Sequence, residues 1–265
     1  MAQAAAVVVG REFYARAVTE VAPDLLGCVI AHRTPHGIVA AVIVEVEAYE
    51  GGGDPASHAY RGMTRRNAVM FGPPGHAYVY FTYGMHFCVN LVCQQPGEAA
   101  AVLLRAGRVI EGAALAVTRS SAGPGRTAPP GGAAGPMSTA AAATEAVTAG
   151  TAMPESGTAK LASGPARLCR ALGIDGERNG ADVCDPAGPL VVLAGDARPP
   201  RELIACGPRV GVRHGADAPL RFWIEGDGAV SAYRPHLPRH RIRVVPAAGT
   251  PGAGTPAAGA PRPPG

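Results

Sequence analysis

The run from Ile38 to Tyr49 constrains the fold of this 265-residue chain more than any other segment does. It is rich in valine and ends in alternating valine and glutamate, with the letters VEVEAY at residues 44–49. Successive side chains of a β-strand point to opposite faces of the sheet. The alternation therefore predicts a strand with two unlike faces, one made by Val42, Val44 and Val46 and the other by Glu45, Glu47 and Tyr49. Glu47 and Tyr49 are expected to be neighbours at the end of this strand.

Hydrophobic periodicity and turn residues predict the other elements. Helical spacing covers residues 11–26 and 166–172. Strand-like runs cover residues 26–31, 77–81, 86–93, 101–105, 190–193, 209–212 and 220–225. Residues 82–85 are expected to form the tip of a hairpin between the second and third of these runs.

Two parts of the chain are not expected to join the core. Residues 120–157 consist almost entirely of Ala, Gly, Pro, Ser and Thr, and residues after 247 are rich in Pro and Gly. Such composition buries too little apolar surface to offset the entropy of ordering the chain. We therefore predict one domain over residues 11–245, with a flexible insertion at 120–157 and flexible tails at 1–10 and 247–265.

Overall charge says little about partners, because the net charge is +4 and the pI is about 8.8. The single lysine, Lys160, stands against 23 arginines, a bias that we attribute to a GC-rich genome. The six cysteines form no CxxC pair, which favours buried reduced thiols. The apolar run at residues 4–9 has no basic flank and is too short for a signal peptide or a membrane span, so a cytoplasmic protein is expected.

Aromatic residues and cations concentrate in one window. Eight of the thirteen aromatic residues lie between Tyr49 and Phe87, and residues 55–97 contain no Asp or Glu. The window holds several arginines and histidines: Arg61, Arg65, Arg66, His58, His76 and His86. Aromatic faces beside fixed cations suit a surface that stacks nucleobases and holds phosphates.

Glu47 ends the strand beside this window. A lone glutamate at a strand end is most simply a solvent-facing charge. Its neighbours favour a second interpretation, in which an ionised carboxylate deprotonates a water or supports positive charge that develops on a sugar. Tyr83, followed by Gly84 at the predicted hairpin tip, should project from the fold, as apolar wedges that open base stacks do.

Several motifs, taken in order, resemble the alkyladenine (3-methyladenine) DNA glycosylase family of base-excision repair. They are Glu47-Ala48-Tyr49, His58, Thr64-Arg65-Arg66-Asn67, Met70-Phe71, the run from Tyr78 to Asn90, Val102-Leu103-Leu104-Arg105-Ala106, Ser163-Gly164-Pro165 with the helix after it, and Arg209-Val210-Gly211-Val212. The resemblance spans residues 11–245 apart from the insertion. It implies a monofunctional glycosylase that flips alkylated purines out of damaged double-stranded DNA and leaves an abasic site.

The resemblance also implies roles for individual residues. Glu47 matches the base that activates the attacking water, and Arg105 and the carbonyl of Val210 match groups that hold this water. Tyr49, His58 and Tyr80 match the pocket for the flipped base, and Asn90 matches the side chain that excludes guanine. Tyr83, Met85, Arg66 and Asn67 match the DNA-binding surface. The implied fold is α+β, a single mixed domain with a curved antiparallel β-sheet and surrounding helices, without metal or other cofactor, as a monomer.

Three other functions are alternatives to this one. A zinc base deaminase needs HxE and PCxxC ligand motifs, which the sequence lacks. A glycosylase with lyase activity needs an amine nucleophile, and the sole Lys160 lies at the edge of the insertion. A non-catalytic nucleic-acid-binding module, or a related formyltransferase-like binding domain, would explain the aromatic and basic surface without Glu47. Release of free base by the wild type but not by Glu47→Gln would separate these alternatives.

Overall fold

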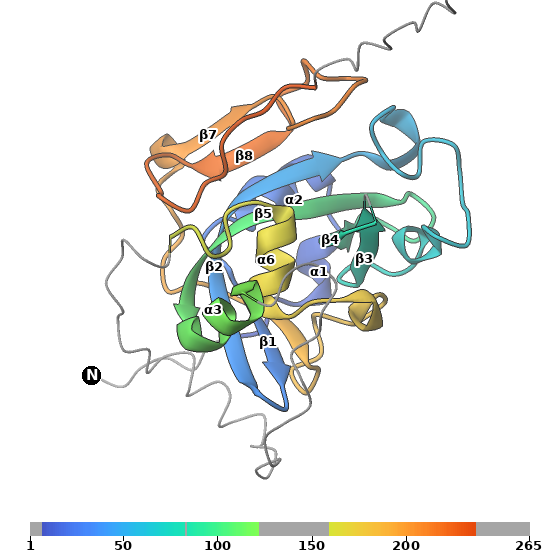
Figure 1. Cartoon of the computed structure of the whole chain (residues 1–265). Coiled ribbons are helices and arrows are strands. Elements are labelled where there is room, and N and C mark those ends of the chain that lie inside the picture. The colour runs from blue at the N-terminus through green and yellow to red at the C-terminus, as the bar shows by residue number, and fades with distance from the viewer. Residues whose placement is uncertain (1–6, 83, 122–158, 237–265) are drawn as a thin grey trace, which may run out of the picture.

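The computed structural model describes residues 7–82, 84–121 and 159–236. Its eight strands form one curved antiparallel sheet (Figure 1). The strands are β1 (Val29–Thr34), β2 (Gly37–Tyr49), β3 (Ala77–Thr82), β4 (His86–Cys93), β5 (Ala100–Glu111), β6 (Leu190–Leu193), β7 (Ile204–Gly207) and β8 (Arg221–Ile224). This confirms the predicted α+β class.

The sheet runs in the order β3-β4-β5-β2-β1-β6 and branches at β2. The first half of β2 pairs with β1, whereas Glu45, Val46 and Glu47 pair with β8 on the same edge. Strand β7 extends this branch by pairing with β8, and the two form the hairpin at the top of Figure 1. The branch therefore begins where β2 carries its glutamates.

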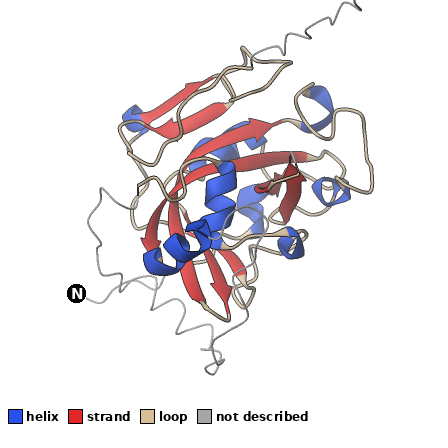
Figure 2. Cartoon of the chain, viewed as in Figure 1, coloured by secondary structure: helices blue, strands red, loops and turns tan. Residues whose placement is uncertain are grey.

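Short helices cover the sheet, as the colouring in Figure 2 makes plain. They are α1 (Arg11–Tyr14), α2 (Val18–Asp24), α3 (Ala113–Ser121) and α6 (Pro165–Leu172), with 3-10 turns η1 (Gly51–Gly53), η2 (Ala68–Phe71), η3 (Gly176–Arg178) and η4 (Arg201–Leu203). Helix α6 begins at a proline and ends at Leu172, and Gly173 caps it in the left-handed conformation with a φ of 73°. Residues of α2 and α6 share one core cluster with β2, β4 and β5.

Several sequence predictions need correction. The expected helix over 11–26 is broken into α1 and α2, β1 begins at Val29, and β5 continues to Glu111. Residues 209–212 form a turn and not a strand, because Gly211 adopts a φ of +69°. Helix α3 and strand β7 were not predicted. The predicted insertion, 120–157, begins inside α3, and its residues 122–157 lie outside the described residues. The predicted flexible tail 1–10 is wrong for its described part, because Val8 bridges to Leu193 and Val9 is buried in the core. Residues 1–6 and the predicted tail 247–265 lie outside the described residues.

The predicted two faces of β2 hold only in part. The pairing of β2 with β5 moves from Ile43↔Gly107 to Glu45↔Ala106 and then to Val46↔Leu104. Val44 and Arg105 are thus left over, one on each strand. Val46 consequently lies in the main core with Ile43, whereas Val44 packs in a different cluster. The prediction that Val42, Val44 and Val46 share a face is therefore wrong for Val46.

Candidate functional site

Cross-strand pairing places the predicted residues of the sheet on one face. Tyr78 of β3 lies opposite Asn90 of β4, Asn90 lies opposite Leu103 of β5, and Leu103 lies opposite Glu47 of β2. Paired residues point to the same side of a sheet, and so do residues two positions along a strand. Tyr80 and Tyr49 thereby join the same face, while the intervening apolar residues fill the core on the other side.

Glu47 lies at the centre of this face and is fully buried. Its Oε1 accepts a hydrogen bond of 2.7 Å from the backbone N–H of Val210, and a guanidinium nitrogen of Arg105 lies 3.2 Å away. Its Oε2 accepts the hydroxyl of Tyr49 over 2.9 Å. The structure thus brings together Glu47, Tyr49, Arg105 and Val210 as predicted, although Val210 presents its N–H and not its carbonyl to the glutamate.

Burial raises the pKa of Tyr49 well above its usual range, and the neighbouring Glu47 carboxylate raises it further. The phenol therefore stays protonated at any ordinary pH and remains a donor to Glu47. Because its donors fix both carboxylate oxygens, Glu47 can adopt few orientations. Each oxygen of a carboxylate can accept two hydrogen bonds, so Oε2 retains room to accept a proton from a water.

Glu45 holds Arg105 in place from the other side. The Oε1 of Glu45 accepts from the Nε atoms of Arg105 and Arg221 at 2.9 and 2.7 Å and from the Ser231 hydroxyl at 2.9 Å, and Oε2 accepts from the Ser231 N–H at 2.7 Å. Burial alone would raise the pKa of Glu45, but these cations and hydrogen bonds lower it overall. Glu45 is therefore saturated with partners and serves as the fixed counter-charge of Arg105.

A second buried ion pair lies under Tyr49. Arg209 makes two parallel hydrogen bonds to the carboxylate of Asp54 and a third, of 3.0 Å, to the carbonyl of Ala48. Its guanidinium carbon lies 4.6 Å from the centre of the Tyr49 ring, a cation–π distance. The turn that brings Asp54 here needs glycine at Gly51, where φ is +74° and a Cβ would approach the carbonyl oxygen of Glu98 to 2.2 Å.

The charges of these groups balance. Six of them are less than 10 % exposed: Glu45, Glu47, Asp54, Arg105, Arg209 and Arg221. Three carboxylates and three guanidinium groups sum to zero, which makes their burial affordable in a medium that penalises unpaired charge. Sequence reasoning missed Asp54, Arg221 and Ser231, and it quoted Arg209 only as part of a motif, without a role. The position of Arg209 beside Val210 could have suggested a place near the site, but no local pattern identifies Asp54 as its partner.

Two of the predicted pocket residues, His58 and Tyr80, form one aromatic group with Tyr78. The His58 Nδ1 and the Tyr78 hydroxyl share a hydrogen bond of 3.0 Å, and the rings of His58 and Tyr80 meet edge to face with centres 4.5 Å apart. Burial lowers the pKa of His58, and the nearby Arg66 cation lowers it further. His58 is therefore neutral at pH 7 and can both donate and accept a hydrogen bond.

Asn90 is buried beside this group and donates its amide to the carbonyl of Tyr78 over 3.1 Å. Arg66 is exposed, and its guanidinium carbon lies 5.6 Å from the Tyr80 ring centre. Met85 is 50 % exposed at the hairpin turn, as a surface contact would require. Tyr83 lies outside the described residues.

Asn67 differs from the prediction. Only 2 % of it is exposed, and its side-chain amide donates to the carbonyls of His58 and Gly62. Its side-chain oxygen accepts from the backbone N–H and the hydroxyl of Thr64. Both the amide nitrogen and the side-chain oxygen of Asn67 are thus hydrogen-bonded within its own loop. Asn67 therefore shapes the loop that carries His58 and Arg66, and its side chain does not reach the surface.

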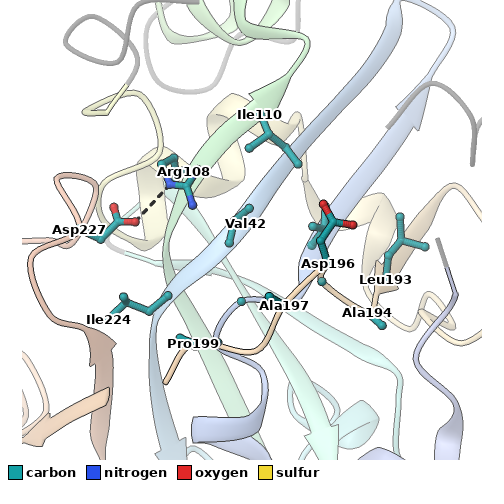
Figure 3. Close-up of a pocket in the computed structure, with 13 residues that line it drawn as sticks. Val42, Arg108, Ile110, Leu193, Ala194, Asp196, Ala197, Pro199, Ile224 and Asp227 are labelled. Carbon is teal, nitrogen blue, oxygen red and sulfur yellow. Dashed lines mark hydrogen bonds and ion pairs between the residues drawn. The ribbon is translucent and has the colours of Figure 1, made fainter. Parts of the chain in front are cut away.

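A surface pocket of about 420 Å³ lies elsewhere on the sheet (Figure 3). Val42, Ile110 and the segment 194–197 line it. Two of its three charged residues, Arg108 and Asp227, pair with each other at 3.2 Å, and the third is Asp196. None of the predicted site residues lines this pocket.

The described part of the chain contains no group of three or more His, Cys, Asp or Glu side chains placed to hold a metal ion. None of its helices is long and apolar enough to cross a membrane.

Comparison with known proteins adds an independent observation. The sequence profile of the family described as methylpurine-DNA glycosylase matches residues 12–228. A Streptomyces avermitilis protein whose name includes "3-methyladenine DNA glycosylase" is 48% identical over 242 residues, which cover 87% of this chain and 94% of that protein. Similarly named proteins of Leifsonia xyli and Methanocella arvoryzae are 43% and 42% identical, over 87% and 82% of this chain and 95% and 90% of theirs.

Proposed function

The chain belongs to the methylpurine-DNA glycosylase family, and from that premise we propose that it hydrolyses the N-glycosidic bond of methylated purines in duplex DNA. The reaction releases the free base and leaves an abasic site. The observation that carries this proposal is the buried Glu47 carboxylate, oriented by three donors on the face of the sheet that also presents Tyr49 and Tyr80.

In the proposed reaction Glu47 acts as the general base. As the bond from the base to sugar C1′ breaks, its electron pair leaves with the purine, and the sugar gains positive charge. Glu47 takes a proton from a water whose oxygen then bonds to C1′. The negative charge of Glu47 also stabilises the sugar cation before the new bond is complete. Arg105 and the carbonyl of Val210 hold the water in this scheme.

The damaged base would leave the helix and enter the aromatic pocket. Tyr49, His58 and Tyr80 would enclose it, because Tyr49 and Tyr80 lie on the same face as Glu47 and the His58 ring packs against Tyr80. Stacking on an aromatic ring contributes about 1–3 kcal/mol per base, which is comparable to the few kcal/mol that flipping costs. Asn90, buried on the floor of this face, would exclude the exocyclic amine of guanine.

The DNA itself would contact the hairpin and the loop before η2. Arg66 and Met85 are exposed there and supply a cation and an apolar side chain. In the proposed complex the partner is damaged double-stranded DNA and the enzyme acts as a monomer. A lyase step is not proposed, since the sole lysine, Lys160, lies at the edge of the predicted insertion, and the hydrogen bond found for it goes to the carbonyl of Gly228 and not to the group around Glu47.

The test uses duplexes with a single 7-methylguanine or 3-methyladenine. Free base is measured by chromatography, and strand cleavage is measured with and without alkali. Free base together with alkali-dependent cleavage is the expected result. Binding without release of base would favour the non-catalytic module, and cleavage without alkali would show a lyase.

A further inference from the structure

We propose that Asp54 and Arg209 are positioning residues for the reaction, which hold Tyr49 and Val210 in the arrangement that orients Glu47. The proposal rests on the proposed function, because it explains how the base that activates water is kept in place. Neither side chain hydrogen-bonds to Glu47, so both residues would act through others.

The Arg209 side chain is held rigidly. Its side chain is 1% exposed and its carboxylate partner Asp54 is 3% exposed. One guanidinium nitrogen also donates to the carbonyl of Ala48, the residue between Glu47 and Tyr49. The planar guanidinium thereby ties three segments together: the end of β2, the loop after η1 and the turn after β7. A planar fork bound to a carboxylate in two places has little freedom to rotate.

Two donors to Glu47, the Tyr49 hydroxyl and the Val210 N–H, belong to residues that lie next to Arg209. The Tyr49 ring lies against the guanidinium, with 4.6 Å between the guanidinium carbon and the ring centre. Val210 follows Arg209 directly in the chain, so anchoring the arginine also anchors the Val210 peptide. Tyr49 donates to Oε2 of Glu47 at 2.9 Å and Val210 donates to Oε1 at 2.7 Å. One arginine therefore supports a donor to each oxygen of the carboxylate.

The Glu45–Arg105 pair on the other side of Glu47 has a parallel arrangement. Glu45 fixes Arg105, which contacts Oε1 of Glu47, just as Asp54 fixes Arg209 beneath Tyr49. A buried ion pair adds little stability compared with apolar residues of similar size, so stability alone does not account for it. An arginine–carboxylate pair instead fixes the position and orientation of the groups that it contacts. Small errors in such placement can reduce a rate by about 100-fold.

The experiment compares wild type, Arg209→Lys and Asp54→Asn on a duplex with one 7-methylguanine. Single-turnover excision is measured over a range of enzyme concentrations, and melting temperature is measured in parallel. Both variants should lose about 100-fold in the maximal rate, while the enzyme concentration at half-saturation changes by less than about threefold. The matched controls are Arg108→Lys and Asp227→Asn, an ion pair of the same sheet at the pocket of Figure 3, and their rates should equal wild type.

Chemical rescue separates positioning from simple loss of folding. Added guanidinium at low millimolar concentration should restore excision by Arg209→Ala in a saturable manner, without any effect on Glu47→Gln. If Arg209→Ala does not fold, Arg209→Lys decides. Folded variants that excise at the wild-type rate, or that lose only DNA affinity, would overturn the positioning role alone. A wild type that releases no methylated base would instead overturn the proposed function.

Discussion

Val210 donates its backbone N–H to Oε1 of Glu47 over 2.7 Å, although 163 residues separate the two in the chain. Val210 lies in the segment between β7 and β8, so this bond connects that segment to the end of β2. A backbone amide, a phenol and a guanidinium together hold the Glu47 carboxylate in one orientation. We expect the chemistry of the protein to depend on this orientation.

Glu47→Gln should abolish excision and retain most of the affinity for a damaged duplex. The amide keeps the shape of the side chain, and its oxygen can still accept from Val210, but it cannot take a proton from water. Single-turnover excision and a gel-shift titration on the same duplex test this. Excision near the wild-type rate would remove Glu47 from the catalytic role and favour the binding module.

Tyr49→Phe should slow excision by about tenfold with little change in DNA affinity. The ring and its contact with Arg209 remain, whereas the hydrogen bond to Oε2 of Glu47 is lost. A hydrogen bond to a charged group contributes about 1.5–3 kcal/mol, and tenfold in rate corresponds to about 1.4 kcal/mol. The maximal single-turnover rate is the measurement. A pure loss of affinity would mean that the hydroxyl acts on the DNA and not on Glu47.

The sequence was sufficient to predict that Glu47 and Tyr49 are neighbours on one face of a strand, because strand alternation is a local property. Their hydrogen bond confirms it. The same reasoning failed at Val46, since the shift in register near Val44 depends on pairing with β5, more than fifty residues later. The hairpin of β3 and β4 was predicted almost residue by residue because its two strands are adjacent in sequence.

Long-range charge pairing accounts for most of what was missed. Asp54 and Arg209 are 155 residues apart, and no local sequence pattern in either segment predicts that the two residues pair. Residues 209–212 have the apolar composition of a strand, but the structure uses them as a turn that buries Arg209. Composition likewise could not show that Asn67 folds its amide inward onto its own loop.

Stability should fall on acidification partly because of His58. Burial lowers its pKa in the folded state, whereas the unfolded value is about 6.5. The unfolded chain therefore binds a proton first as the pH falls, so the contribution of His58 is present above about pH 6.5 and is lost below it. Melting temperatures from pH 7.5 to 5 should fall less steeply for His58→Gln than for wild type. Parallel curves would show that His58 is not the titrating group.

Arg66→Gln should weaken binding to duplex DNA without changing the maximal excision rate. Arg66 is exposed and sits beside Tyr80, where a phosphate could reach it. Loss of one phosphate contact reduces the slope of log affinity against log salt by about 0.9. Affinities between 50 and 200 mM salt measure this slope, and Arg170→Gln on α6 is the matched control. An unchanged slope with a slower rate would move Arg66 from the DNA surface to the base pocket.

Asn90→Ser should relax the choice of base. Asn90 is buried, lies opposite Tyr78 across the hairpin and donates its amide to that residue's carbonyl. If its side chain forms the floor of the pocket, shortening it opens space for the exocyclic amine of guanine. Excision of guanine-type bases should then rise, while adenine-type lesions lose less than about tenfold, or about 1.4 kcal/mol.

The measurement for Asn90→Ser is single-turnover excision of 7-methylguanine, hypoxanthine and normal guanine, each compared with wild type. The melting temperature decides between the two roles of this amide. A hydrogen bond that only ties β4 to β3 would, when lost, lower stability and slow every substrate alike. A change in the ratio of rates between guanine and hypoxanthine requires contact with the base. Uniform loss together with a lower melting temperature would therefore make Asn90 structural and remove it from the selectivity of the pocket.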